Sequence, residues 1–287
     1  MHEAKPSRTA LRVAIRRASH QILDRPLVFA DPLALRIIGS EQAATLETDR
    51  DNIVSRSLRA WMAVRSRYAE DQLAHAIREG VEQYVVLGAG LDTFAYRNPH
   101  AGLRVFEVDH PATQQWKREQ LQTAGIVIPD ENAVFVPVDF ERQNLRSELD
   151  RSGLRMDQPA FFSWLGVVPY LTDRAFEETL GFIASMPRPS GVAFDYGVAR
   201  SLLKWTERLV LDRLSARVAA AGEPFQLFFE PEKLAVRLKG IGFMDLEDLS
   251  SAEINGRYFS GRTDGLELKG NLARLVTVSR RSDNPEP

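Results

Sequence analysis

Residues 84–93 read YVVLGAGLDT, an apolar run that passes directly into two closely spaced glycines. A short, continuous apolar run is typical of a strand buried in a parallel sheet. Gly88 and Gly90 can adopt the positive φ angles of a tight turn, and without a side chain they let a ligand approach the backbone. Because a strand, a glycine turn and a helix form nucleotide-binding sites in such sheets, this segment is the first candidate for a ligand site.

The rest of the chain after residue 84 alternates short runs rich in Val, Ile and Phe with longer segments of helical periodicity. This alternation predicts βαβ units, and hence an α/β fold with a doubly wound, seven-stranded sheet. The predicted strands are 83–87, 103–108, 133–138, 160–167, 191–195, 243–249 and 272–279, and the predicted helices are 111–124, 173–185, 200–221 and 231–239. Residues 250–270 lack helical periodicity, so the last two strands are expected to be antiparallel neighbours.

Residues 1–80 have a different pattern, which predicts an N-terminal helical cap. Ser7 can cap a first helix, residues 29–32 (FADP) form a turn before a second, and residues 56–79 form a long amphipathic helix. We expect three parts: a cap or lid at 1–80, a Rossmann-like domain at 81–280 and a disordered tail at 281–287. Residues 1 to about 60 are expected to close over the ligand.

Composition excludes several classes of site. The 287 residues contain no cysteine, which excludes disulfides, thiolate zinc sites and a cysteine nucleophile, and the histidines show no metal-ligand spacing. A net charge of -2 gives no field that would gather phosphates, so nucleic acid is not an expected partner. The most apolar segment, 160–171, is too short to span a bilayer. We expect a cytoplasmic protein without a membrane partner, and the sequence does not indicate the oligomeric state.

Two strands end in carboxylates that could hold a nucleoside. Asp109 ends the second strand 19 residues after Gly90 (109 − 90), close to the spacing at which such sheets present an acid to the ribose hydroxyls. Glu107 lies on the same face of the strand and is the alternative. Asp139 ends the third strand and could accept from an adenine amino group, with Phe140 beside the ring; a helix cap is the alternative role for these acids.

The loop favours S-adenosylmethionine over a dinucleotide. Thr93 stands where a dinucleotide site has its third glycine. S-adenosylmethionine has no phosphate and carries a sulfonium, an ammonium and a carboxylate. A loop with Asp92 and backbone carbonyls suits this molecule better than a loop built to hold phosphates would. A nicotinamide-dependent oxidoreductase remains the rival, although Tyr170 and Tyr196 lack the lysine four residues on that many such enzymes use.

Seven blocks in order resemble the leucine carboxyl methyltransferase family, and within it the bacterial S-adenosyl-L-methionine-dependent methyltransferases. They are residues 8–10 (RTA), 29–33 (FADPL), 65–68 (RSRY), 87–97 (LGAGLDTFAYR), 106–111 (FEVDHP), 138–140 (VDF) and 164–171 (WLGVVPYL). The resemblance implies the class I methyltransferase fold and S-adenosyl-L-methionine as cofactor. It implies a cofactor site in which Gly88 and Gly90 line the methionine part, Asp109 holds the ribose, Asp139 and the backbone of Phe140 hold the adenine, and Arg65, or Arg67 in its place, holds the carboxylate.

The chain departs from the family pattern at two positions. Leu165 replaces an acid that the eukaryotic protein-methylating members carry after the fourth strand, and Phe94 replaces an arginine common in bacterial relatives. Both changes make the site more apolar, so methylation of a protein C-terminus is not expected. We expect O-methylation of a small-molecule carboxylate or hydroxyl, with a non-catalytic S-adenosylmethionine-binding protein as the alternative. The catalytic residues are not identified; candidate bases or pocket residues are His110, Tyr170 and Tyr196.

Overall fold

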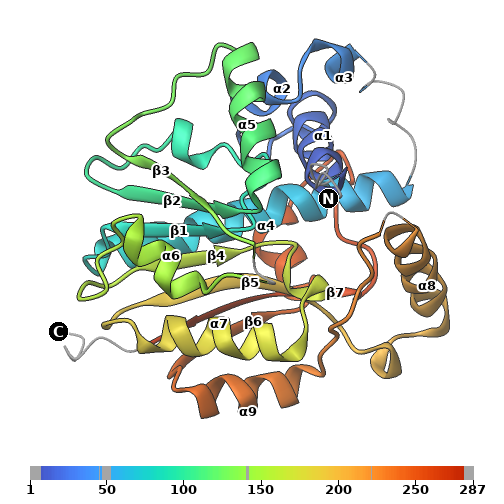
Figure 1. Ribbon diagram of the computed structural model, residues 1–287. Helices are drawn as coiled ribbons and strands as arrows, with labels where there is room; N and C mark the ends of the chain where they lie inside the picture. The colour runs from blue at the N-terminus through green and yellow to red at the C-terminus, as the bar shows by residue number, and fades with distance from the viewer. Residues whose placement is uncertain (1–7, 45, 47–52, 140–141, 221, 281–287) are drawn as a thin grey trace. The chain divides into compact units, whose positions relative to one another are not determined.

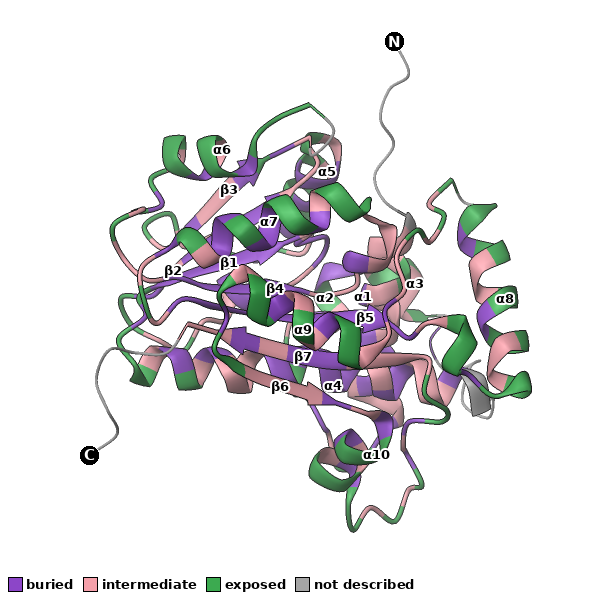
Figure 2. Ribbon diagram, turned by 90° about the horizontal axis from the view of Figure 1, so that it is seen from below, coloured by how far each residue is buried: buried purple, intermediate pink, exposed green. Residues whose placement is uncertain are grey.

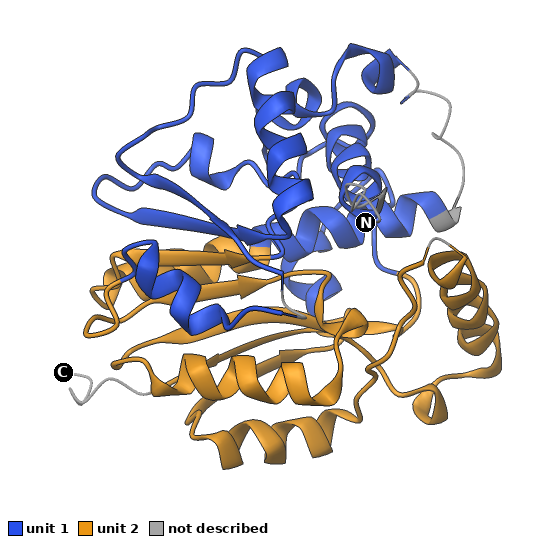
Figure 3. Ribbon diagram, in the orientation of Figure 1, with its two compact units in different colours: residues 1–67, 88–154, 254–268 blue, residues 68–87, 155–253, 269–287 orange. Residues whose placement is uncertain are grey.

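The computed structural model describes residues 8–44, 46, 53–139, 142–220 and 222–280. Their strands form one mixed, seven-stranded sheet in the order β3-β2-β1-β4-β5-β7-β6 (Figure 1). From β1 the chain adds β2 and β3 on one side of the sheet and then β4 and β5 on the other side. This is the doubly wound arrangement predicted from the sequence. The chain forms two compact units, and both are built from stretches that alternate along the sequence (Figure 3).

Unit 1 comprises residues 1–67, 88–154 and 254–268. Its two strands, β2 (Arg104–Asp109) and β3 (Ala133–Pro137), pair in parallel, with Val108 opposite Val136. Its helices are α1 (Arg8–Leu23), α2 (Ala34–Ile37), α3 (Ser40–Ala44), the first part of α4 (Ile53–Arg78), α5 (Pro111–Thr123) and α6 (Leu145–Arg151). Ala14 and Ala18 of α1, Ile37 of α2, and Leu121 of α5 belong to one apolar cluster. Burial of this cluster fixes the N-terminal helices within the unit.

Unit 2 comprises residues 68–87, 155–253 and 269–287. Strands β1 (Gln83–Leu87), β4 (Phe161–Trp164) and β5 (Gly191–Gly197) run parallel, whereas β7 (Ala273–Ser279) is antiparallel to β5 and to β6 (Asp245–Leu249). The central strands are buried, and α7 (Asp173–Ser185) and α9 (Pro231–Ile241) lie side by side (Figure 2). The predicted antiparallel pairing of the last two strands is therefore confirmed.

The main differences between the observed and the predicted elements lie in four places. The strand predicted at 160–167 ends at Trp164, because Gly166, with φ 70°, turns the chain. The helix predicted at 200–221 is a 3-10 turn, Arg200–Leu202, followed by α8 (Trp205–Ala219). Helix α6 was not predicted; it is too short for a clear period. It begins at Leu145, after the N-cap Asn144, whose side chain accepts from Ser147 N. Short helical turns at Ser251–Ile254 and Asn255–Phe259 occupy part of the segment expected to be irregular.

Some predictions concern residues outside the described part of the chain. They are the cap at Ser7 and the disordered tail at 281–287. The division of the chain at residue 80 stays a prediction. No helix of the described ranges is long and apolar enough to cross a membrane.

Candidate functional site

The glycine loop begins where β1 ends and is attached by its backbone to β2. The amides of Gly88 and Ala89 both donate to the carbonyl of Val108, at 2.8 and 3.0 Å. Gly88 and Gly90 have φ angles of 69° and 47°, in the left-handed region that favours glycine. A Cβ added to Gly90 would lie 3.1 Å from the Cβ of Ala10 on α1, so the helix closely approaches the loop. The loop therefore needs glycine both for its conformation and for the space it leaves.

Asp109, at the carboxyl end of β2, directly faces this loop. Its Oδ2 accepts a hydrogen bond from the amide of Gly90 at 2.6 Å, and its Oδ1 accepts from the amide of His110 at 2.7 Å. Burial raises the pKa of the carboxyl, while the two backbone amides and the nearby Lys117 oppose the shift. The residue is only partly buried, which leaves a charged acceptor at the edge of the loop.

Glu107, the alternative ribose acid, is buried in a different environment. It is 1% exposed; its Oε1 lies 2.8 Å from Nζ of Lys117, and its Oε2 accepts from the hydroxyl of Tyr96 at 2.6 Å. Burial raises the pKa of Glu107, and the Lys117 ammonium opposes that shift. The carboxylate is thus committed to an internal ion pair, and of the two acids Asp109 is the one placed at the loop.

Asp139 follows the end of β3, beside the end of β2. Asp109 lies opposite Pro137 in the register, and the amide of Val138 donates to the carbonyl of Asp109 at 2.9 Å. The Asp139 side chain is 26% exposed and lies 3.6 Å from Nε of Arg142. The structure thus brings the two strand-end acids to one edge of unit 1, as the sequence predicts. Phe140 lies outside the described residues.

The arginine predicted to hold the cofactor carboxylate lies on α4. Arg65 is buried, at 6% exposure, whereas the alternative Arg67 is exposed. A guanidinium binds a carboxylate more strongly where water is excluded, so burial favours Arg65 for this role. The assignment of Arg65 stays a prediction.

The three candidate bases have different environments. His110 is the N-cap of α5, and its Nδ1 accepts from the amide of Ala112 at 3.2 Å. Tyr196 is buried and donates to Asp248 at 2.7 Å; burial first, and then the Asp248 carboxylate, raise the pKa of its hydroxyl. Tyr170 is half-buried in a 3-10 turn, with its ring 5.1 Å from that of Phe225. Of the three, His110 and Tyr196 are engaged in structural hydrogen bonds.

Sequence reasoning missed a group of buried polar side chains behind the loop. We name Arg17, Asp31, Asp92, Thr93 and Arg97 the Asp31 network. Thr93 Oγ1 donates to Asp31 Oδ2 at 2.7 Å, and Nε of Arg17 lies 2.9 Å from the same oxygen. Burial opposes ionisation of Asp92, but the cations around it, with Arg17 foremost, lower its pKa. Four of the five members lie in the sequence blocks 29–33 and 87–97, but nothing in a single sequence pairs these blocks.

Comparison with known proteins identifies the family. The model of the leucine carboxyl methyltransferase family matches residues 10–184. The chain belongs to this family. A Bacillus subtilis protein named as an S-adenosyl-L-methionine-dependent methyltransferase is 32% identical over 98% of this chain and its own full length. Family and relatives make the protein an S-adenosyl-L-methionine-dependent methyltransferase, with that molecule as its cofactor.

Solved structures of methyltransferases share its fold. A Thermobifida fusca protein of this class superposes with a TM-score of 0.59 over 98% of this chain and 97% of its own, at 16% identity. The magnesium protoporphyrin IX methyltransferase of Synechocystis, solved with bound S-adenosylhomocysteine, superposes with a TM-score of 0.50, at 12% identity and over 86% of this chain and 91% of its own. At these identities the likeness concerns the fold alone.

The residues at the methyltransferase's loop suit the groups of its cofactor. Asp109 offers carboxylate oxygens to hydroxyls, Asp92 is a carboxylate suited to a cation, and the left-handed glycines expose backbone. The amides of Gly88, Ala89 and Gly90 donate to Val108 and Asp109, whereas a pyrophosphate site turns such loop amides toward the ligand. The chemistry of the loop therefore fits S-adenosyl-L-methionine.

Proposed function

We propose that the methyltransferase transfers a methyl group to an oxygen of a small molecule, a carboxylate or an acidic hydroxyl. In this proposal the cofactor lies on the loop, bound by Gly88, Gly90, Asp109, Asp139 and Phe140, with Arg65 on its carboxylate. The observation that carries the cofactor site is the hydrogen bond of 2.6 Å between the Gly90 amide and Asp109, which joins the glycine loop to the acid of β2.

The bound cofactor supplies a methyl group already activated by its sulfonium. The protein therefore needs to hold the acceptor oxygen in line with that methyl group and to exclude water. Asp109 fixes the ribose end through its carboxylate, and the loop glycines allow close backbone approach. Ala10 of α1 lies so close to Gly90 that a Cβ at position 90 would be 3.1 Å from its Cβ.

The environments of the candidate bases support an acceptor that needs no base. His110 accepts a hydrogen bond as a helix cap, and Tyr196 donates to Asp248, which Arg274 binds at 2.7 Å. Because the pKa of the Tyr196 hydroxyl is raised, this group stays protonated at neutral pH and cannot take a proton from an acceptor. Carboxylates and acidic hydroxyls are already ionised, so they react without proton transfer.

The test is methyl transfer from labelled S-adenosyl-L-methionine to matched panels of small carboxylic acids, acidic phenols and ordinary alcohols. We expect product with acids and a rate that is nearly constant from neutral to mildly alkaline pH. Tyr170→Phe should change the maximal rate by less than about threefold, since no proton is transferred. A rate that rises with pH, together with loss of activity in Tyr170→Phe, would instead assign a hydroxyl acceptor and a tyrosine base.

The non-catalytic alternative predicts cofactor binding by calorimetry without any methylated product. Mass-spectrometric screening of a cell extract with labelled donor separates the two, because a single labelled product establishes turnover. We further propose that the protein is cytoplasmic.

A further inference from the structure

One buried carboxylate joins the N-terminal segment to the cofactor loop. Asp31 lies in the turn between α1 and α2 and is 1% exposed. Its Oδ2 accepts from Thr93 at 2.7 Å and lies 2.9 Å from Nε of Arg17, while its Oδ1 accepts from the amide of Leu33 at 3.0 Å. The same side chain thus contacts α1, its own turn and the loop.

The other members of the Asp31 network complete these contacts at the loop. Arg17 donates to the carbonyl of Leu91 and lies 3.6 Å from Asp92 Oδ2. Arg97 Nε donates to Thr93 Oγ1 at 3.1 Å and lies 3.5 Å from Asp31 Oδ1. Two guanidinium groups and two carboxylates therefore balance in charge, and loss of one carboxylate leaves a buried cation without compensation.

The contacts fall on the three residues that directly follow Gly90. Arg17 and Asp31 hold Leu91, Asp92 and Thr93, while Asp109 holds the Gly90 amide. A displacement of Thr93 changes the backbone at Gly90, and thus the distance between the loop and Asp109. Each hydrogen bond between the loop and the cofactor that such a displacement breaks costs about tenfold in affinity.

We infer that Asp31 is a positioning residue for the cofactor loop, acting through Thr93 and Arg17 on the affinity for S-adenosyl-L-methionine. The inference rests on the proposed cofactor site at residues 88–93. Asp31 acts on the loop rather than on the reacting atoms, so its loss should raise KM for the cofactor more than it lowers kcat.

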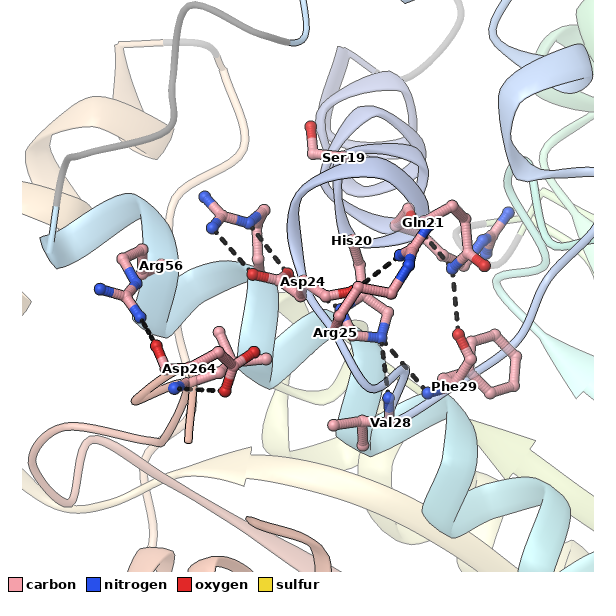
Figure 4. A network of polar contacts seen from close by, with 12 residues as sticks. Ser19, His20, Gln21, Asp24, Arg25, Val28, Phe29, Arg56 and Asp264 are labelled. Carbon is pink, nitrogen blue, oxygen red and sulfur yellow. Dashed lines mark hydrogen bonds and ion pairs between the residues drawn. The ribbon is translucent and has the colours of Figure 1, made fainter. Parts of the chain in front are cut away.

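A second buried carboxylate of the same segment provides the control. Asp24 is 3% exposed, and its oxygens lie 3.1 and 3.2 Å from the guanidinium of Arg59 and 3.0 Å from Nδ1 of His20. Figure 4 shows Asp24 beside His20, in the contact that joins α1 to α4. These partners lie on α1 and α4 rather than in the loop, so Asp24→Asn reports the cost of a buried ion pair alone.

The experiment measures the dissociation constant of S-adenosylhomocysteine by calorimetry, the melting temperature, and KM and kcat with an active acceptor. The full-length variants are Asp31→Asn, Asp24→Asn, Thr93→Val and Thr93→Ser. We expect Asp31→Asn and Thr93→Val to weaken binding about 10- to 100-fold. Thr93→Ser, which keeps the hydroxyl, should bind within about threefold of wild type, as should Asp24→Asn despite a lower melting temperature. The losses in Asp31→Asn and Thr93→Val should not add in the double variant.

Equal losses of affinity in Asp31→Asn and Asp24→Asn, or wild-type binding by Thr93→Val, would overturn the inference. If Asp31→Asn does not fold, the pair Thr93→Val and Thr93→Ser decides, because the two differ in one hydroxyl at a fully buried position. A wild-type protein that binds no S-adenosylhomocysteine would overturn the proposed cofactor site as well. Binding by wild type with unaffected variants would overturn only the role of Asp31.

Discussion

Two acids two residues apart on β2 have different surroundings, which predict different roles. Asp109 is partly buried; it accepts from the amides of Gly90 and His110 and has a side-chain hydrogen bond with Thr113. A carboxylate with these partners still has capacity to accept from a ligand. Glu107 is fully buried, with Lys117 and Tyr96 on its two oxygens. The alternation of a strand puts both on one face, but only the strand end reaches the site.

Replacement of these acids should therefore affect different quantities. Asp109→Ala should weaken binding of S-adenosylhomocysteine by more than ~1.5 kcal/mol without unfolding the protein, because a charged acceptor is removed. Glu107→Ala should lower the free energy of unfolding by about 3–5 kcal/mol, because Lys117 is left buried without its partner. Calorimetry and urea denaturation measure the two effects, and the reverse order of affinities would move the ribose role to Glu107.

Cofactor affinity should also depend on pH through Asp109. Burial raises the pKa of this carboxyl above its ordinary value. Its protonation therefore begins at a higher pH than that of an exposed aspartate, whose pKa is about 3.9. In the proposed site the charged form of Asp109 accepts the ribose hydroxyls, so affinity should be constant near neutral pH and fall as pH decreases through the raised pKa. Calorimetry over a pH series checks this, and Asp109→Asn should remove that dependence while binding more weakly throughout. A wild-type affinity that increases on acidification would contradict the assignment.

At the scale of elements, the glycine loop and α1 depend on each other. Ala10 lies where a larger residue would meet Gly90, and a Cβ on Gly90 would lie 3.1 Å from the Cβ of Ala10. The chain must therefore keep a small residue on the helix as well as glycine in the loop. This contact gives a physical reason for alanine at position 10, within the block RTA at residues 8–10.

Gly90 variants separate the two demands on this position. Gly90→Val should abolish cofactor binding, because a branched side chain both strains a backbone with φ 47° and meets α1. Gly90→Ala should cost about 1–3 kcal/mol of stability for its conformation. The double variant Gly90→Ala, Ala10→Gly should regain the stability lost through the contact between the two Cβ atoms. It should not regain the stability lost because alanine adopts a left-handed φ. Denaturation and calorimetry measure both, and full cofactor affinity in a folded Gly90→Val protein would show that affinity does not depend on the backbone conformation at Gly90.

At the scale of the whole molecule, unit 1 is built from three separate stretches of chain. Ala14 and Ala18 of α1 are buried in the same apolar cluster as Leu91 after the loop and Leu121 of α5. In addition, Arg17 forms an ion pair with Asp31, and Asp24 forms one with Arg59. The N-terminal helix is thus part of the core of unit 1, and the closing of residues 1 to about 60 over the ligand stays a prediction.

This arrangement predicts the outcome of two truncation experiments. Deletion of residues 1–24 should prevent cooperative folding, because it opens the apolar cluster and leaves Asp31 and Arg59 without the partners Arg17 and Asp24. The double variant Arg8→Ala, Thr9→Ala should keep the melting temperature within a few degrees and reduce methyl transfer, if these residues close over the acceptor. Differential scanning calorimetry and turnover measure the two. A stable truncated protein would show that α1 is dispensable for the core, and a parallel fall in activity and stability in the double variant would contradict the lid.

The sequence by itself determined the class of fold and one side of the site. Local signals were sufficient there: the apolar run before Gly88, the acids at the ends of β2 and β3, and the periodicity of α5 and α7 all depend on residues close together in the chain. The antiparallel pairing of β6 and β7 followed from a connection without a helical period. The bounds of β4 and the short helix α6 were wrong or missed, because one glycine turn or seven residues give too little periodicity.

Only the tertiary structure distinguishes candidate residues that look equally suitable in the sequence. Glu107 and Asp109 are alike in sequence, but the structure buries Glu107 beside Lys117 and places Asp109 at the loop. His110 and Tyr196 are equally plausible bases in the sequence, and the structure engages His110 with the amide of Ala112 and Tyr196 with Asp248. Asp31 and Thr93, 62 residues apart, share a hydrogen bond that no local pattern encodes. The physical reason is that burial and ion pairing depend on which distant segments meet, whereas strand and turn formation depend on neighbours along the chain.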